Sequence, residues 1–115
     1  MNTPITFGNM GEVAPLHRGW VVGRFIEMEN PLHSTDVEIK YHVAKKGEHN
    51  EVVASSKAQS LTILIRGEFK ISFPEQSKEF ILKKEGDFIF WNPGIGHDWE
   101  VREDSLLITV RWPSL

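Results

Sequence analysis

Apolar and polar residues alternate at every second position over most of this chain from Val37 onward, and this period limits the possible folds more than any other feature. Phe69, Ile71 and Phe73, for example, are separated by polar residues. Such alternation is typical of β-strands with one face in a core, and no segment shows the period of an amphipathic helix over three turns. The pattern predicts strands over residues 20–27, 37–43, 61–65, 68–73, 79–82, 88–91, 97–102 and 106–112.

Residues that favour turns separate these predicted strands, for instance at Arg66-Gly67 and Glu103-Asp104. Eight short strands at a spacing of roughly 8–12 residues predict an antiparallel β-sandwich or barrel. A length of 115 residues suits one domain. We therefore expect a single domain over residues 1–115, with an arm of 19 residues, rich in Pro and Gly, that lies across a sheet edge.

The composition excludes several classes of function. A formal net charge of −3 and a pI near 5.9 provide no basic surface for DNA or RNA, so we expect no nucleic-acid partner. The chain has no cysteine, which excludes disulfides, thiolate zinc sites and cysteine nucleophiles and fits a reducing compartment. It contains neither a stretch of about 20 apolar residues nor a signal-peptide pattern, so we expect a cytoplasmic protein without a membrane partner.

The segment EGDFIFWNPGIGHDW resembles the second sequence motif of the cupin family, G(X)5PXG(X)2H(X)3N. Gly86 begins the motif, and His97 stands at the position of the family histidine. Pro93 is one place late, and Val101 replaces the final asparagine. The overall register is therefore similar to that of cupins, while the turn is remodelled.

The first cupin motif, G(X)5HXH(X)3,4E(X)6G, is matched in its glycines but not in its metal ligands. Gly47 and Gly67 align with the opening and closing glycines. The two histidine positions then fall on Val53 and Ser55, and the glutamate position falls on Ser60. Three of the four ligands that the resemblance implies are thus replaced.

The resemblance implies an all-β fold, an antiparallel jelly roll or double-stranded β-helix barrel of the RmlC-like type, with residues 37–112 as the barrel core. It implies no particular activity, because cupins include isomerases, oxygenases, sugar binders and sensor domains. Small cupins also resemble one another in forming homodimers. Leu61, Ile63 and Ile65 lie on a predicted strand that is apolar on nearly both faces, which likewise favours a homodimer.

The replaced ligands favour a site without a metal or other cofactor. A transition metal needs several donors within about 2.0–2.2 Å of one point, and His97 supplies a single imidazole. A displaced site formed by His42, His49 and His97 stays open as an alternative, and Glu51 follows His49 by two positions. Exposed loop side chains are the more common role for such residues.

A cavity inside the barrel is the predicted binding site. His97 and Trp99 share one face of an extended strand, and we expect them to line the cavity with Ser55, Ser60 and Thr62 from the facing sheet. Apolar walls with a few polar groups suit a small organic ligand. In the alternative, Trp99 simply fills the barrel, because small barrels are usually packed with side chains.

Three classes of function follow from these patterns. The first is binding of a small molecule in a sensing or accessory role. The second is an enzyme of isomerase, lyase or oxygenase type, which uses relocated histidines for a metal or His97 as a general acid or base near neutral pH. The third is a structural dimer without a ligand. For Arg111 we favour a surface position paired with a carboxylate over an inward position that binds an anion.

Overall fold

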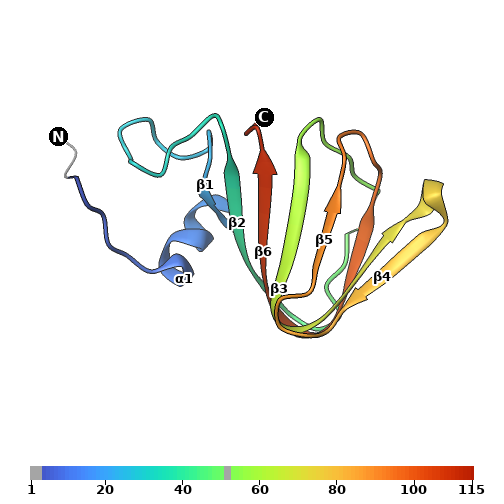
Figure 1. The fold of residues 1–115 in the computed structure, drawn as a ribbon. Helices are drawn as coiled ribbons and strands as arrows, with labels where there is room; N and C mark the ends of the chain where they lie inside the picture. Colours follow the sequence, from blue (N-terminus) through green and yellow to red (C-terminus); the bar gives the residue numbers. More distant parts are fainter. Residues whose placement is uncertain (1–3, 51–52) are drawn as a thin grey trace.

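The chain folds into antiparallel β-strands with little helix (Figure 1). The structure is a computed structural model that describes residues 4–50 and 53–115. No helix in these two ranges is long and apolar enough to cross a membrane. The strands are β1 (Trp20–Val22), β2 (Glu38–Ala44), β3 (Gln59–Phe73), β4 (Lys78–Leu82), β5 (Phe88–Trp91) and β6 (Asp98–Trp112). The helical segments are α1 (Met10–Val13) and the 3-10 turns η1 (Ala14–His17) and η2 (Pro74–Gln76). The predicted all-β class is confirmed.

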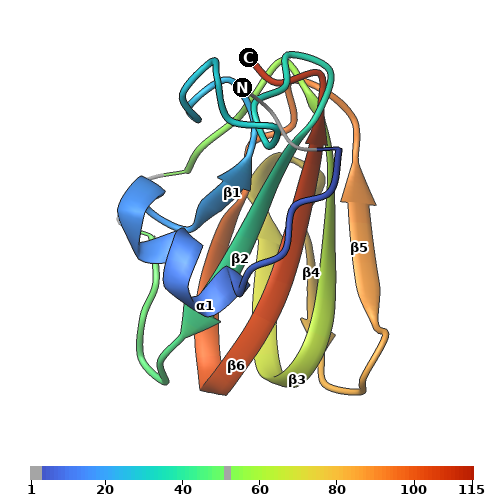
Figure 2. The same ribbon diagram turned by 90° about the vertical axis from the view of Figure 1, so that its left-hand side faces the viewer.

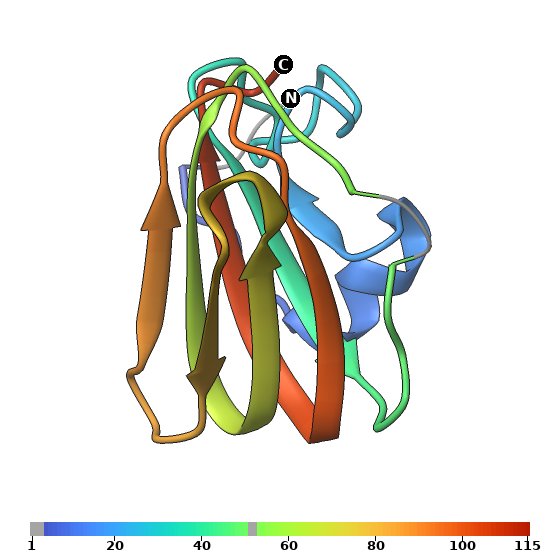
Figure 3. The same cartoon turned by 90° about the vertical axis from the view of Figure 1, so that its right-hand side faces the viewer.

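Two long strands, β3 and β6, form the centre of the sheet. The strand order is β1-β2-β6-β3-β4, and β5 pairs with β3 beside this path. Residue pairs between β3 and β6 run from Gln59 and Trp112 at one end to Ser72 and Asp98 at the other. The sheet bends over along these two strands, so one layer holds β1, β2 and β5 and the other holds β4 (Figures 1 and 3).

The turns predicted at Arg66-Gly67 and Glu103-Asp104 are wrong, because β3 and β6 continue through them. Each long strand therefore replaces two predicted strands. The pairing of β3 with β6 shifts register at Arg66 and Glu68, as at a β-bulge. Turns and bulges both favour Gly in a left-handed conformation, so the local sequence does not separate the two structures.

Gly67 lies where the bent main chains of β3 and β6 come closest. Its φ of +106° is strained for any residue with a side chain, and a Cβ here would collide with the Ser105 hydroxyl and the Asp104 carbonyl oxygen. The Ser105 hydroxyl accepts a hydrogen bond from the Glu68 main-chain N–H at 3.0 Å and donates one to the Glu103 carbonyl oxygen at 2.6 Å. The bend thus depends on a glycine and on one buried hydroxyl.

The bulge also changes which residues of β3 face inward. Side-chain direction alternates along a strand, so one extra residue exchanges the inner and outer sets. The inner residues are even-numbered before the bend and odd-numbered after it, which lets both halves contribute to the core. They are Ser60, Thr62, Leu64, Phe69, Ile71 and Phe73, all buried.

The N-terminal arm reaches the edge of β2, where the main-chain N–H of Tyr41 donates to the carbonyl oxygen of Gly19 at 2.8 Å. The strand predicted over residues 20–27 ends at Val22, after pairing with β2. Residues 4–9 extend away from the sheet before α1 (Figures 1 and 2). The side chain of Phe7 in this segment is 99% exposed, so it has almost no contact with the rest of the chain.

Candidate functional site

A cavity of about 60 Å³ lies between the inner faces of the two layers. At about 30 Å³ of liquid volume each, this corresponds to about two water molecules. Its walls are aromatic and aliphatic, and consist of Phe69, Ile71, Trp91 and Trp99. Its polar lining groups are Lys40, His42, Thr62, His97, Thr109 and Arg111. Six of the ten lining residues are thus polar or charged, so the cavity is more polar than most small-molecule sites.

His97 lies just before β6 and is held by the loop that crosses this end of the barrel. Its main chain forms two hydrogen bonds of 2.9 Å with Ala54, and its ring lies 4.7 Å from the Trp91 ring, centroid to centroid. Burial of the imidazole, followed by the positive charge of Arg111, lowers the pKa of His97 and outweighs the opposing effects of the Ile95 carbonyl and Asp98. The side chain is 6% exposed. It is therefore a buried, neutral imidazole near neutral pH.

Trp99 forms a fixed wall of the cavity. Its ring stacks on Phe69 with 5.6 Å between centroids and meets the edge of His42 at 5.5 Å. Its main-chain N–H donates to the Asn50 side-chain oxygen at 2.6 Å. These contacts come from three different segments of the chain and fix the position of the indole in the cavity lining.

Two threonines supply hydroxyl groups from neighbouring strands. Thr62 and Thr109 are paired across β3 and β6, and their hydroxyl oxygens lie 3.0 Å apart. One register step away, Ser60 pairs with Arg111. Ser60 is 1% exposed and is not in the cavity lining, and its hydroxyl has no hydrogen-bond partner in the described part of the chain. Ser55 is exposed outside the cavity.

Arg111 and Lys40 were not among the predicted site residues, yet both face the cavity. Arg111 does pair with a carboxylate, as favoured, at 3.5 Å from Nη1 to Glu38 Oε2, but it lies on the inner face of β6. Glu38 is 3% exposed and also accepts a hydrogen bond of 2.8 Å from the Ser114 hydroxyl. Burial and then the charge of Arg111 lower the pKa of Lys40, which outweighs the opposing effect of Glu48.

The alternation of Glu38, Lys40 and His42 along β2 was the available signal for these residues. It places three polar side chains on one face of a strand. It does not say that this face is the inner one, since charged side chains usually face water.

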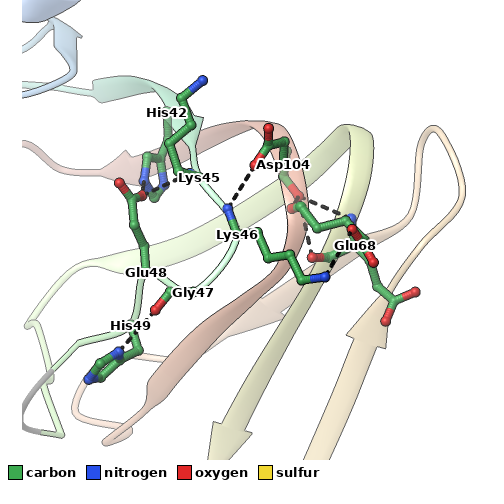
Figure 4. A network of polar contacts seen from close by, with 10 residues as sticks. His42, Lys45, Lys46, Gly47, Glu48, His49, Glu68 and Asp104 are labelled. Carbon is green, nitrogen blue, oxygen red and sulfur yellow. Dashed lines mark hydrogen bonds and ion pairs between the residues drawn. The ribbon is translucent and has the colours of Figure 1, made fainter.

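The three histidines of the displaced metal site are only partly brought together. His42 and His97 line the same cavity. His49 is exposed at the far end of the 45–49 loop from His42, and its Nδ1 lies 3.2 Å from the Gly47 carbonyl oxygen (Figure 4). His42 instead contacts Glu48, with 3.8 Å from Nε2 to Oε1. Burial and the charge of Lys40 lower the pKa of His42 despite the opposing effect of Glu48.

The donors at the cupin ligand positions do not fit a transition metal. Val53 has no donor and is 51% exposed, and Ser55 is exposed, so His97 and the hydroxyl of Ser60 are the buried polar groups left. No group of three His, Asp or Glu side chains suited to a metal ion occurs within residues 4–50 and 53–115. Glu51, which the sequence placed near His49, lies outside the described residues.

No protein-family model matches the sequence, and no curated protein gives a significant match. Solved structures do match the fold. KdgF from Halomonas sp. aligns with a TM-score of 0.62 and 18% identity over 70% of this chain and 73% of its own. A cupin superfamily protein from Desulfitobacterium hafniense aligns with a TM-score of 0.62 and 16% identity over 69% of each chain.

A third match is a conserved protein of unknown function from Streptococcus pyogenes, with a TM-score of 0.60 and 21% identity over 67% of this chain. The alignment spans 64% of that protein, which is less than two thirds of its length. At these identities the similarity concerns the fold and not the activity. The bent antiparallel sheet and its structural neighbours show that this chain has the RmlC-like fold of the cupin superfamily.

Proposed function

We propose that this protein binds a small organic ligand in the cavity between the two sheet layers, without the metal that many cupins use. The main support is the cavity itself, where hydroxyl groups of Thr62 and Thr109 and the imidazole of His97 converge between aromatic walls. Only a ligand of a few non-hydrogen atoms matches its volume. A cytoplasmic location, expected from the lack of a signal-peptide pattern and of cysteine, stays a prediction.

Tryptophan fluorescence offers a direct test, because Trp91 and Trp99 line the cavity. A panel of neutral, acidic and basic compounds of up to six non-hydrogen atoms is titrated into the protein. We expect saturable changes for a subset of the panel. The double substitution Thr62→Val and Thr109→Leu removes both lining hydroxyl groups together, so neither threonine is left without its partner, and it should abolish those changes. Ile108→Leu, which changes an outer residue of β6, is the control.

A lack of any saturable response in the wild-type protein would refute this proposal. So would a response that persists unchanged in the Thr62→Val and Thr109→Leu double variant, because binding would then not depend on the two hydroxyl groups.

The enzymatic alternative has less support. A general base is usually oriented by a partner such as a carboxylate, whereas Nδ1 of His97 faces the Ile95 carbonyl oxygen at 3.5 Å. If the protein were a metal-dependent enzyme, protein purified without an affinity tag would contain nearly one metal ion per chain. The His97→Ala variant would lose this metal. Plasma mass spectrometry of both proteins tests for metal dependence, and far less than one metal per chain in both would exclude it.

We also propose that a second copy of the chain covers the outer face of β2, β3, β5 and β6. This face is apolar and includes Val43, Phe88 and Phe90, which are 54%, 64% and 40% exposed. Exposed apolar patches of this kind are typical of interaction surfaces. The N-terminal arm favours a second copy over another partner. Phe7 in this arm is exposed and does not pack on the sheet of its own chain, so it can pack on the sheet of a second copy.

Sedimentation equilibrium tests this assembly. We expect a dimer for the wild-type chain and a monomer for Val43→Glu, since a carboxylate in the interface loses its hydration. Met28→Glu is the control, because Met28 is 81% exposed and lies in the loop between β1 and β2. A monomeric wild-type protein, or a dimer that tolerates the Val43 substitution, would contradict this arrangement.

A further inference from the structure

The inner face of the sheet concentrates positive charge at one end of the cavity. Lys40 and Arg111 both line it, and Glu38 is the buried carboxylate that pairs with Arg111. Two cations and one buried anion leave an excess of one positive charge. Glu48, which contacts His42, has a side chain that is 46% exposed, so water screens its charge more strongly. The net charge of the cavity lining therefore favours a ligand with one negative charge.

Two buried hydrogen-bond donors at this end have no partner in the described part of the chain. They are Nε of Arg111 and the hydroxyl of Ser60. The two residues are direct neighbours across β3 and β6, so their side chains lie on the same face of the sheet. Leaving a buried polar group unpaired costs about 1–3 kcal/mol, and most buried groups in folded proteins are paired. Arg111 lines the cavity, so its guanidinium is the group that an acceptor from outside the chain can approach, whereas Ser60 lies behind the lining.

The remaining walls limit the size and character of that acceptor. Trp91, Trp99 and Phe69 offer apolar surface, and His97 is neutral near pH 7 because its pKa is lowered. A volume of about 60 Å³ admits a charged group with a short apolar tail and excludes larger metabolites. A carboxylate meets these demands better than a phosphate ester, which carries more charge and more polar surface.

We propose that the ligand of this cavity is a short-chain carboxylate, whose charge is balanced by the guanidinium of Arg111 and the ammonium of Lys40. This inference rests on the proposed function and names the chemical class of its ligand. The tail of the carboxylate lies against Trp99 and Trp91.

Matched pairs of compounds test the charge requirement. Acetate, propionate and lactate are titrated by calorimetry and by tryptophan fluorescence at pH 8 and low ionic strength, alongside acetamide, propionamide and lactamide. The amides have the same shape without the charge. We expect saturable binding of at least one acid and at least tenfold weaker binding of its amide.

Substitutions then locate the charge. Lys40→Met should weaken binding of the acid at least tenfold. Lys70→Met removes the same charge from the outer side of β3, where Lys70 pairs with Glu79 at 3.5 Å, and should have no effect. Because Arg111→Met alone would leave Glu38 buried and unpaired, it is combined with Glu38→Gln. This double variant, once circular dichroism has shown that it folds, should also lose binding.

The outcomes separate this inference from the proposed function. Equal binding of acids and amides, or an unchanged affinity in Lys40→Met, would overturn the carboxylate assignment while the cavity remained a binding site. Binding of inorganic phosphate but of no carboxylate would overturn it as well. If none of the acids or amides binds, and the wider panel also gives no response, then both proposals fail.

Discussion

Substitution of Gly67 by alanine should be among the most damaging single changes in this protein. A residue with a side chain at a φ of +106° has a strained main chain, which costs about 1–3 kcal/mol. The added Cβ also collides with Ser105 and the Asp104 carbonyl oxygen, and overpacking of this kind costs about 1–3 kcal/mol more. The expected loss of about 2–6 kcal/mol is large against a total stability of about 5–15 kcal/mol.

Gly86 provides a matched control for this substitution. Its φ of +91° is similar, but a Cβ added there would meet no heavy atom within 4 Å outside its immediate neighbours. Gly86→Ala therefore carries the main-chain strain without the collision, at about 1–3 kcal/mol. Urea unfolding of both variants, followed by circular dichroism and tryptophan fluorescence, measures the two losses at comparable m-values. Equal losses would refute the close approach of β3 and β6 at the bend.

Three further predictions concern stability. Because the pKa of His97 is lowered in the folded state, the unfolded chain binds a proton more readily than the folded chain as the pH falls below about 6.5. The unfolding free energy should therefore decrease as the pH falls through this range, and His97→Gln should reduce this pH dependence in urea titrations. The pKa of Asp87 is lowered because the main-chain N–H groups of Lys84 and Lys83 donate to its carboxylate. The stability that this carboxylate contributes is full above pH about 4 and is lost in acid. The difference in unfolding free energy between Asp87→Asn and the wild-type protein should therefore shrink as the pH falls. Leu64→Ala, at a side chain with 0% exposure, should cost about 2–5 kcal/mol in the same assay.

The period of the sequence predicted where most strand residues lie but not where the strands end, because a strand with one buried face must alternate. Phe69, Ile71 and Phe73 follow this rule and lie in the core. The bends were not predictable in the same way, since Gly67 suits a turn and a bulge equally. The cupin resemblance added the overall barrel, which alternation alone left open between a sandwich and a barrel.

The site was harder to predict because it depends on which face of each strand is the inner one. His97, Trp99 and Thr62 lie in the cavity lining, whereas Ser55 lies outside it because its segment is not part of a regular strand. Lys40 was missed because charged side chains normally face water. The unusual feature of this sheet is that its outer face is more apolar than parts of its inner face. A period of two shows that the faces differ, but it does not show which face is the inner one.

The pairing of β3 with β6 has a consequence for the order of folding. Even the pair nearest in sequence, Ser72 and Asp98, encloses both β4 and β5. The hairpin of β3 and β4 is local and can form early, while β6 must wait until a long loop closes. Proteins dominated by such distant contacts fold in milliseconds to seconds. Because the cavity needs β6 in place, we expect it to form late in folding, so that a ligand binds the completed fold and slows its unfolding rather than guiding its assembly.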